Sequence, residues 1–289
     1  MQALTFYLVY PFIYLLASSP FRVLYKVSDF FYYLLKLSGY RKKVILQNLK
    51  NSFPEKSEKE INTIYQAYYR YLCDLIMETL KTLKMTEKEA KERCVFHNAS
   101  WLDDLYKEKK SILVVMGHYG NWEWAGPSFT LNTDYQLVVI YRPLSNIRFE
   151  KMMVRMRTKF GTKITPVALT LRDMVANRKD ITATALIADQ TASPENAHWT
   201  NFLNQDTAVF TGPEKLARRF DYPVVYMKIT RIRRGYYDVT PELLFAHPAT
   251  TDEGDISQTF TRRLEIDIQN DPVPWLWSHK RWKHTRKKV

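Results

Sequence analysis

The chain has 289 residues and a formal net charge of +13, with 46% apolar and 14% aromatic residues. This length suits one large domain or two small ones, and the apolar content is sufficient for a sizeable core. The positive charge indicates a polyanionic partner, but the sequence lacks the zinc-finger spacing and basic zipper of common nucleic-acid-binding modules. We therefore expect an anionic membrane or phosphorylated substrates as partners, and no nucleic acid.

The first residues of the chain are strongly apolar. Residues 3–17 contain no charged side chain, but they are fewer than the about 20 apolar residues that a helix needs to span a bilayer. Extending the run to Phe21 gives a marginal span that Pro11 and Pro20 interrupt. No positively charged segment precedes the run and no A-x-A site follows it, which disfavours a cleaved signal peptide. The run therefore either spans a membrane or lies at its surface, with an aromatic core hairpin of a soluble protein as the alternative.

Residues 21–37 add an amphipathic stretch in which basic side chains alternate with Phe and Tyr, a pattern typical of a helix lying in the lipid headgroups. We predict that residues 1–40 form a helical membrane anchor and that residues 41–289 form the main domain. The basic residues 41–43 place this domain on the cytoplasmic face. The two cysteines have no CxxC spacing and do not make a disulfide framework, in keeping with a reducing compartment.

Helical signals follow the apolar segment. Residues 41–50 predict a short basic helix. A capping box, Ser57 with Glu60, opens a long helix whose apolar residues recur at helical spacing, and a second box, Thr86 with Glu89, opens another helix.

From residue 95 onward, apolar strand-like runs alternate with helical patterns. This alternation predicts an α/β domain with a mixed central sheet flanked by helices. The candidate strands are 111–117, 136–141, 181–188, 223–230 and 236–240, and the candidate helices are about 98–108, 146–160, 169–178, 213–220 and 255–270.

The stretch 111–126, SILVVMGHYGNWEWAG, combines a strand signal with polar residues. Its aliphatic run bounded by glycine predicts a strand buried on both faces of a sheet. His118 follows this strand, and Glu123 lies five residues later. Catalytic and ligand-binding groups of open α/β sheets collect beyond the carboxyl ends of strands. An imidazole and a carboxylate at this position therefore predict a functional site.

His118 and Glu123 can meet only through a turn. Five residues of α-helix rotate the chain by about 500°, or roughly 140° net, so the two side chains would not share a face of one regular helix. Gly120 and Asn121 tolerate positive φ and favour a turn that leaves His118 in the loop and Glu123 in the first helical turn. In that geometry Glu123 accepts the proton of one imidazole nitrogen, and the other nitrogen is left as a base.

The sequence supplies this base without an obvious nucleophile. The G-x-S-x-G elbow of serine hydrolases and the HExxH motif of zinc proteases are both absent. We expect no metal and no cofactor. A base without a protein nucleophile suits an enzyme whose substrate is the nucleophile, such as a hydroxyl group that attacks an acyl thioester.

The segment GHYGNWEWAG resembles the HX4E motif of the lipid A biosynthesis acyltransferases, the lauroyl/myristoyl branch of the lysophospholipid acyltransferase superfamily. Four further segments resemble family blocks and occur in family order: Tyr141-Arg142-Pro143 with Asn146, Ala188-Asp189-Gln190, Phe202-Leu203 with Phe210 to Arg219, and Trp277 to Lys283. The resemblance implies a fold like that of glycerol-3-phosphate acyltransferase, a catalytic domain over residues 41–289 and a membrane anchor at the N-terminus. The chain is somewhat short for the family.

The resemblance also implies roles for individual residues. His118 would be the general base and Glu123 its partner, while backbone N–H groups of residues 119–121 or the side chain of Arg142 would stabilise the tetrahedral oxyanion. Asp189 would orient the acceptor or pair with Arg142. The helix that begins at Thr211-Gly212 would receive a phosphate. The full predicted substrate-binding set is Arg142, Asn146, Asp189, Gln190, Thr211, Gly212 and Arg218.

The implied reaction transfers a fatty acyl chain from acyl carrier protein to a lipid A precursor, a phosphorylated glucosamine disaccharide, at the bacterial inner membrane. Both partners and the anionic lipids of that membrane would be attracted by the net positive charge. Alternatives are another glycolipid or a phospholipid as acceptor, acyl-coenzyme A as donor, and a non-enzymatic, membrane-associated basic module. The sequence leaves open the length and branching of the acyl chain, the acylated position and the oligomeric state.

Overall fold

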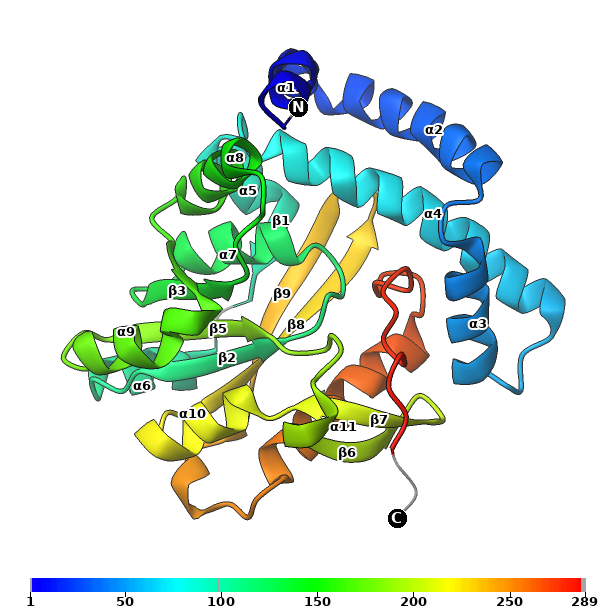
Figure 1. The fold of residues 1–289 in the computed structure, drawn as a ribbon. Coiled ribbons are helices and arrows are strands. Elements are labelled where there is room, and N and C mark those ends of the chain that lie inside the picture. The colour runs from blue at the N-terminus through cyan, green and yellow to red at the C-terminus, as the bar shows by residue number, and fades with distance from the viewer. Residues whose placement is uncertain (1, 98, 287–289) are drawn as a thin grey trace.

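The structure, a computed structural model, describes residues 2–97 and 99–286. In this part of the chain a seven-stranded sheet has the order β1-β9-β8-β2-β5-β3-β4 (Figure 1). Its strands are β1 (Cys94–Phe96), β2 (Ile112–Met116), β3 (Gln136–Tyr141), β4 (Lys163–Pro166), β5 (Thr182–Ile187), β8 (Val224–Arg233) and β9 (Tyr236–Phe245). All neighbouring strands are parallel except β8 and β9, which form an antiparallel pair. The predicted mixed α/β sheet is confirmed.

Helices cover both faces of this sheet (Figure 1). On β2, Leu113 and Val115 pack with the cluster that includes α11, while Val114 packs with the cluster that includes α7. The whole strand is buried, as its apolar run predicts. The helices are α1 (Gln2–Ser18), α2 (Phe21–Ser38), α3 (Lys42–Ser52), α4 (Glu58–Lys81), α5 (Glu87–Arg93), α6 (Ser100–Lys107), α7 (Trp122–Thr130), α8 (Ile147–Thr158), α9 (Thr170–Ala176), α10 (Gly212–Phe220) and α11 (Asp255–Asn270).

Local signals for helix starts are confirmed. Ser57 and Glu60 form a complete capping box at the start of α4, and Thr86 and Glu89 form another at the start of α5. In each box the hydroxyl oxygen accepts from the third backbone N–H, and the glutamate accepts from the capping residue.

Four strands were not predicted. Two of them, β1 and β4, have only three and four residues, too few for a period-2 pattern to be recognised. The other two, β6 (Ala197–Phe202) and β7 (Gln205–Phe210), form a separate antiparallel hairpin rich in polar residues. This hairpin lies between the end of β5 and α10, where the sequence suggested only a connection.

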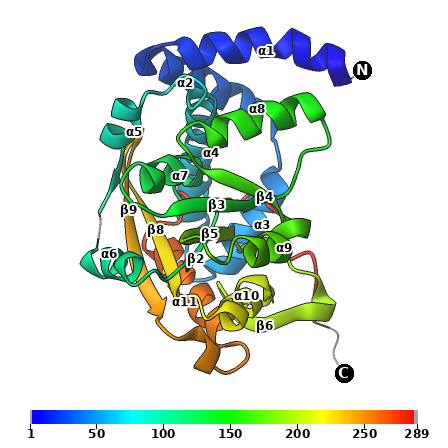
Figure 2. The same cartoon turned by 90° about the vertical axis from the view of Figure 1, so that its left-hand side faces the viewer.

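The N-terminal helices pack onto the α/β body. Figure 2 shows α1 lying across one end of the molecule next to α8, and the rings of Phe6 and Phe149 meet edge to face with centroids 5.1 Å apart. Helix α2 packs along α4, and Ser28 donates a hydrogen bond to the buried Asp74. The predicted segment 1–40 is thus in direct contact with the main domain.

The predicted membrane span finds no support among the described helices. None of them is both long enough and apolar enough to cross a bilayer. Helix α1 ends at Ser18 after 17 residues, and a non-helical break precedes α2. The alternative, that these helices lie at a membrane surface, stays a prediction.

Candidate active site

The turn between β2 and α7 carries His118. Its position in the loop, with α7 beginning at Trp122, confirms the predicted placement of His118 outside the helix that holds Glu123. Gly120 adopts a φ of +61°, and a Cβ atom there would lie 3.0 Å from the Ile229 carbonyl oxygen. A side chain at this position would therefore require the turn to move.

Asn121 has a different function in the turn from the one predicted. Its φ of −97° is not positive, and its side chain caps α7 by accepting a hydrogen bond from the Trp124 backbone N–H at 3.0 Å. The segment after α11 holds the other side of the turn. Gly120 N–H donates to the Pro274 carbonyl at 3.1 Å, and the His118 carbonyl accepts from the Leu276 N–H at 3.1 Å.

The imidazole of His118 is paired with Asp189. Its Nδ1 lies 2.6 Å from Asp189 Oδ1, while the His118 backbone N–H donates to Oδ2 at 2.8 Å. Trp275 Nε1 also donates to Oδ2, at 2.8 Å. An ionised carboxylate only accepts hydrogen bonds, so it takes the proton of Nδ1–H and leaves Nε2 as the basic nitrogen. The amide Nε2 of Gln190 lies 3.3 Å from this nitrogen.

Asp189 stays ionised although it is buried. Burial by itself would raise the pKa of its carboxyl group, but the charge of His118 and the hydrogen bonds from His118 and Trp275 outweigh it. The net result is a pKa below the usual value for aspartate. The site therefore holds a negative charge on Asp189 that orients the His118 imidazole.

The register of the sheet explains why these two residues meet. Strands β2 and β5 are parallel neighbours in which Met116 is opposite Ile187. His118 and Asp189 each lie two residues beyond this pair, so they leave the sheet side by side at the same edge. Both were predicted at strand ends, but the sequence does not show that the two strands are adjacent.

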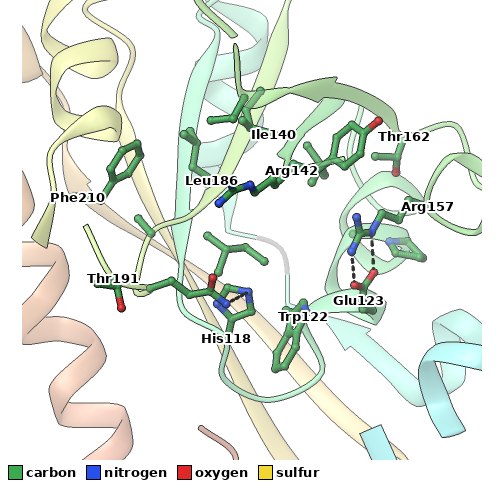
Figure 3. A pocket seen from close by; sticks show the side chains of 18 residues that line it. His118, Trp122, Glu123, Ile140, Arg142, Arg157, Thr162, Leu186, Thr191 and Phe210 are labelled. Carbon is green, nitrogen blue, oxygen red and sulfur yellow. Dashed lines mark hydrogen bonds and ion pairs between the residues drawn. The ribbon is translucent and has the colours of Figure 1, made fainter. Parts of the chain in front are cut away.

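The predicted hydrogen bond between Glu123 and His118 is not formed. Glu123 instead binds Arg157 of α8 in a bidentate pair, with N–O distances of 3.0 and 2.6 Å. The Trp122 ring packs edge-on against the imidazole, with ring centroids 5.0 Å apart (Figure 3). Burial disfavours the charge on Arg157, but the contacts with Glu123 outweigh it and raise the pKa of the guanidinium. The guanidinium of Arg157 therefore stays protonated.

A cavity of about 400 Å³ lies beside the His118–Asp189 pair and the Glu123–Arg157 pair. His118 and Glu123 both line it, together with Arg157 and apolar side chains of β3 and β5 (Figure 3). A smaller apolar recess adjoins it between α7 and the sheet, and Trp122 belongs to the lining of both. A polar end with a base and an apolar remainder suits a substrate that carries a hydrocarbon chain.

Comparisons with known proteins point to the same chemistry. The family model described as bacterial lipid A biosynthesis acyltransferase matches residues 1–284. The chain belongs to this family. It is 22% identical over 251 residues to the lipid A biosynthesis palmitoleoyltransferase of Escherichia coli (strain K12). The aligned region covers 84% of this chain and 79% of the relative. The lipid A biosynthesis acyltransferase of Shigella flexneri has the same identity and coverage.

Two of the substrate-binding residues predicted from the family resemblance line the cavity in addition to His118, whereas Asp189 contacts His118 from outside the described lining. Arg142 is exposed in the loop after β3, and Gln190 follows Asp189. Strand β3 does not neighbour β2, because β5 lies between them. Arg142 nevertheless faces the same cavity, since β3 runs parallel to β5 and ends at the same edge.

The remaining predicted residues of this acyltransferase lie outside the described lining of the cavity. Asn146 caps α8 by accepting from the Arg148 N–H. Thr211 and Gly212 form the start of α10, next to the cavity residue Phe210, and Arg218 lies in the last turn of that helix. A role in binding substrate stays a prediction for these four residues.

The structure narrows the candidates for oxyanion stabilisation. The backbone N–H of Gly120 is already donated to Pro274, which removes it from the predicted turn donors. Arg142 lines the cavity, and none of the hydrogen bonds or ion pairs found among the described residues involves its guanidinium. In residues 2–97 and 99–286, no group of three or more His, Cys, Asp and Glu side chains could hold a metal ion.

Sequence reasoning missed two side chains of this site. Arg157 lies 34 residues from Glu123 on a helix whose pattern contains no motif. Trp275, which donates to Asp189, lies 86 residues away from it in the segment after α11. The position of Asp189 beyond a buried strand is a signal for a functional residue, but it predicts contact with the acceptor or with Arg142. Among the described residues, the side-chain partners found for Asp189 are His118 and Trp275, and the predicted pair with Arg142 is not formed.

A buried carboxylate binds the turn of His118 through Asn121. Glu78 of α4 is completely buried, and its Oε2 accepts hydrogen bonds from Asn121 Nδ2 and Tyr237 Oη, each at 2.8 Å. Burial raises the pKa of Glu78 to about 7, although hydrogen bonds from Tyr237 and Tyr25 oppose this shift. The folded protein therefore binds this proton more tightly than the unfolded chain.

This titration predicts a pH-dependent contribution to stability. Protonation of Glu78 favours folding fully below about pH 4.5, and the contribution is lost as the pH rises through about 7. At about 1.4 kcal/mol per pH unit across this window, the loss is about 3 kcal/mol. Glu78→Gln should therefore gain stability relative to the wild type between pH 5 and pH 8. Thermal unfolding at both pH values measures this difference, and parallel pH profiles would contradict it.

Proposed function

We propose that this chain is an O-acyltransferase that transfers a fatty acyl chain from acyl carrier protein to a lipid A precursor, as a secondary acylation. The observation that carries the proposal is the His118–Asp189 pair, whose basic nitrogen lies at a cavity with an apolar remainder. Membership of the family supplies the class of reaction. The names of the two relatives support lipid A as the acceptor, and the described lining of the cavity contains a base but no serine or cysteine.

The first step is removal of a proton from the acceptor hydroxyl. His118 Nε2 accepts this proton, and the hydroxyl oxygen attacks the carbonyl carbon of the acyl thioester. Asp189 holds the imidazole in the required tautomer and stabilises the imidazolium as it forms. The carboxylate is oriented in advance, because Trp275 Nε1 and the His118 backbone N–H both donate to Oδ2, which leaves Oδ1 for the imidazole.

The second step expels the thiolate. Attack gives a tetrahedral intermediate whose negative charge is placed on the former carbonyl oxygen, and Arg142 is the candidate donor for this charge. Collapse of the intermediate forms the ester and breaks the C–S bond. The imidazolium of His118 returns the proton to the departing thiolate, so that acid, base and charge balance over the cycle.

The Glu123–Arg157 pair has a separate role in this mechanism. It lines the cavity and brings α7 and α8 together. A fixed ion pair presents a dipole to the substrate without adding net charge, and it keeps the guanidinium of Arg157 at a defined position. We assign Glu123 to shaping the substrate cavity and not to relaying the proton of His118.

The exposed surface of the N-terminal helices supports contact with a membrane surface, which we propose to be the cytoplasmic face of the inner membrane. Large apolar side chains of α1 are exposed, including Phe12 at 69% and Leu15 at 65%, and on α2 Leu37 is exposed at 84%. Helices with such a surface in a basic protein are suited to lie among anionic headgroups. The acceptor lipid would then reach the enzyme without leaving the bilayer.

Replacing Phe12 and Leu15 together by serine should weaken binding to vesicles of phosphatidylethanolamine and phosphatidylglycerol. Each side chain would bury apolar surface worth about 1.5–3 kcal/mol, so the loss should be at least about tenfold in affinity. Cosedimentation measures the bound fraction. The matched control replaces Leu243 of β9 and Ile266 of α11, which are also exposed. Equal binding by both double variants would refute a contact between α1 and the membrane.

An acyl-transfer assay tests the proposed reaction. Purified enzyme would receive radiolabelled acyl-acyl carrier protein or acyl-coenzyme A, with a lipid A precursor or a phospholipid as acceptor. We expect label in the lipid A precursor from the carrier-protein thioester. Transfer to the phospholipid alone would assign a different acceptor, and efficient use of acyl-coenzyme A alone would assign a different donor. Absence of transfer to any acceptor would support a non-enzymatic module.

A further inference from the structure

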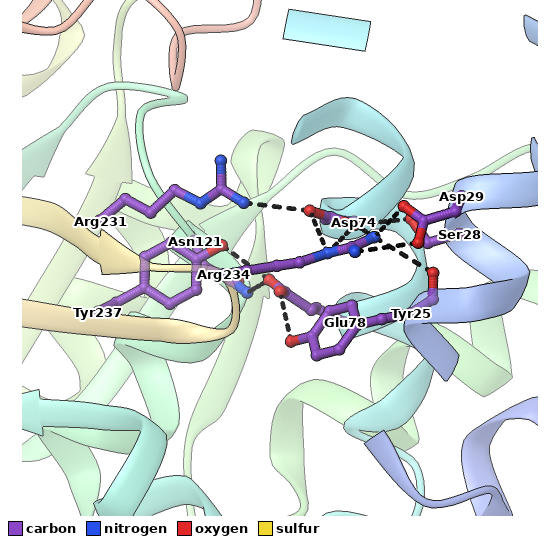
Figure 4. Close-up of polar contacts among 9 residues, drawn as sticks. All are labelled: Tyr25, Ser28, Asp29, Asp74, Glu78, Asn121, Arg231, Arg234 and Tyr237. Atoms are coloured by element: carbon purple, nitrogen blue, oxygen red, sulfur yellow. Dashed lines mark hydrogen bonds and ion pairs between the residues drawn. The ribbon is translucent and has the colours of Figure 1, made fainter. Parts of the chain in front are cut away.

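Helix α2 contacts Glu78, the buried carboxylate that binds the turn of His118. Tyr25 of this helix donates a hydrogen bond to Glu78 Oε1 at 2.9 Å, and Glu78 Oε2 accepts from Asn121 of the turn at 2.8 Å (Figure 4). The buried carboxylate of Glu78 thus connects α2 to Asn121, the residue that caps α7. The sequence had assigned α2 only to membrane attachment.

The orientation of the Glu78 carboxylate is set by three donors from three different segments. Tyr25 holds one oxygen, and Tyr237 of β9 shares the other oxygen with Asn121. The backbone carbonyl of Glu78 additionally accepts from Trp124 Nε1 at 3.0 Å. A buried carboxylate is satisfied only when these donors stay in place, so a shift of one donor is transmitted to the others.

A second set of contacts fixes the position of α2 itself. Asp74, one turn before Glu78 on α4, accepts from Ser28 at 2.7 Å and from Arg234 at 2.6 Å. Arg234 also pairs with Asp29 of α2 at 2.8 Å (Figure 4). These contacts hold α2 in register on α4 and leave Tyr25 little freedom to move away from Glu78.

The hydrogen bonds from Tyr25 and Asn121 to Glu78 form a link between α2 and the turn. At its far end, Asn121 makes two separate contacts. Its Oδ1 caps the Trp124 N–H of α7, and its Nδ2 donates to Glu78. Asn121 is completely buried, and only Tyr119 and Gly120 separate it from His118. The rotamer of Asn121 therefore determines where α7 begins, and with it the path of the backbone that carries His118.

We propose that Tyr25 and Glu78 are positioning residues, which hold the turn of His118 in its productive geometry through Asn121. The proposal rests on the proposed acyl transfer for its kinetic test. It makes α2 a part of the catalytic apparatus and not only an attachment to a membrane. Loss of the link should lower kcat even when no bilayer has to be bound.

Two substitutions each remove one hydrogen bond to Glu78, one from Tyr25 and one from Asn121. Tyr25→Phe keeps the ring and removes the hydroxyl group that reaches Glu78. Asn121→Ser keeps an oxygen that can cap α7, but its side chain is too short to reach Glu78. Tyr33→Phe is the matched control, because Tyr33 lies on the same helix with 58% of its surface exposed.

Acyl transfer from acyl-acyl carrier protein to the lipid A precursor would be measured in detergent micelles. We expect a kcat about tenfold lower for Tyr25→Phe and for Asn121→Ser, since small misplacements of a catalytic group are costly. KM for the donor should change less than about twofold, and Tyr33→Phe should match the wild type. The kcat of the double variant should be no lower than that of the less active single variant, because both substitutions interrupt the same chain of hydrogen bonds. A kcat within about twofold of wild type for both variants, or effects that multiply, would overturn the proposal.

Hydrogen exchange provides a test that does not depend on the substrate. The backbone N–H groups of Gly120 and Trp124 are hydrogen-bonded in the turn and should exchange about tenfold faster in Tyr25→Phe than in Tyr33→Phe. Unchanged exchange would refute the link even if acyl transfer is confirmed. Faster exchange in a protein that transfers no acyl group would refute the proposed function and keep the link. If one of the two variants unfolds at the assay temperature, the other decides the result.

Discussion

Replacing His118 by alanine should lower kcat for acyl transfer by about a thousandfold or more. Among the described residues that line the cavity, His118 is the only histidine, and its imidazole is paired with a carboxylate. General-base catalysis together with the linked proton return is worth about 10²–10⁴. The effect should lie in kcat and not in KM, because Nε2 contacts the proton that moves. Transfer of radiolabelled acyl chains to the lipid A precursor measures both constants.

The control for His118→Ala is His247→Ala, a substitution of an exposed histidine in the loop after β9. It should leave kcat unchanged. Mass spectra of lipid A from cells that express each variant give an independent measure of acyl chain number. If His118→Ala cells contain the same acylated lipid A as wild-type cells in the absence of any other acyltransferase, the assignment of His118 as base is wrong.

Much of the fold could be predicted because its signals are local. The capping boxes at Ser57 and Thr86 need only four consecutive residues, and both are formed in the structure. The strand 136–141 is likewise identified by its own aliphatic pattern and has these bounds in the structure. Elements without such patterns, such as the three-residue β1 and the polar hairpin of β6 and β7, depend on pairing with distant segments.

The candidate site depends even more than the fold on contacts between distant segments of the chain. The placement of His118 in a turn followed from five residues of sequence, whereas its partner was assigned to the nearest carboxylate along the chain. The pairing of β2 with β5 decides the contact instead, because it places Asp189, two residues beyond β5, within hydrogen-bond distance of His118. Glu123 was then free to bind Arg157, a residue with no sequence signal.

Asp189→Asn should lower kcat by about 10³–10⁴, the effect expected when the group that orients a catalytic histidine can no longer accept its proton. The asparagine oxygen can still accept from Trp275, so the fold should be retained. Its amide nitrogen would face His118 Nδ1 and donate to it, which places the remaining ring proton on Nε2. The imidazole would then present a proton to the acceptor hydroxyl where a lone pair is required.

The matched comparison is Glu123→Gln, which removes the charge from the carboxylate that lines the cavity. We expect a smaller loss in kcat, of about 10- to 100-fold, with a higher KM for the substrate, because Arg157 loses its partner and the cavity changes shape. Thermal unfolding would verify that both variants are folded. If Glu123→Gln costs as much kcat as Asp189→Asn and leaves KM unchanged, Glu123 takes part in proton transfer, and the cavity must close around His118 when substrate binds.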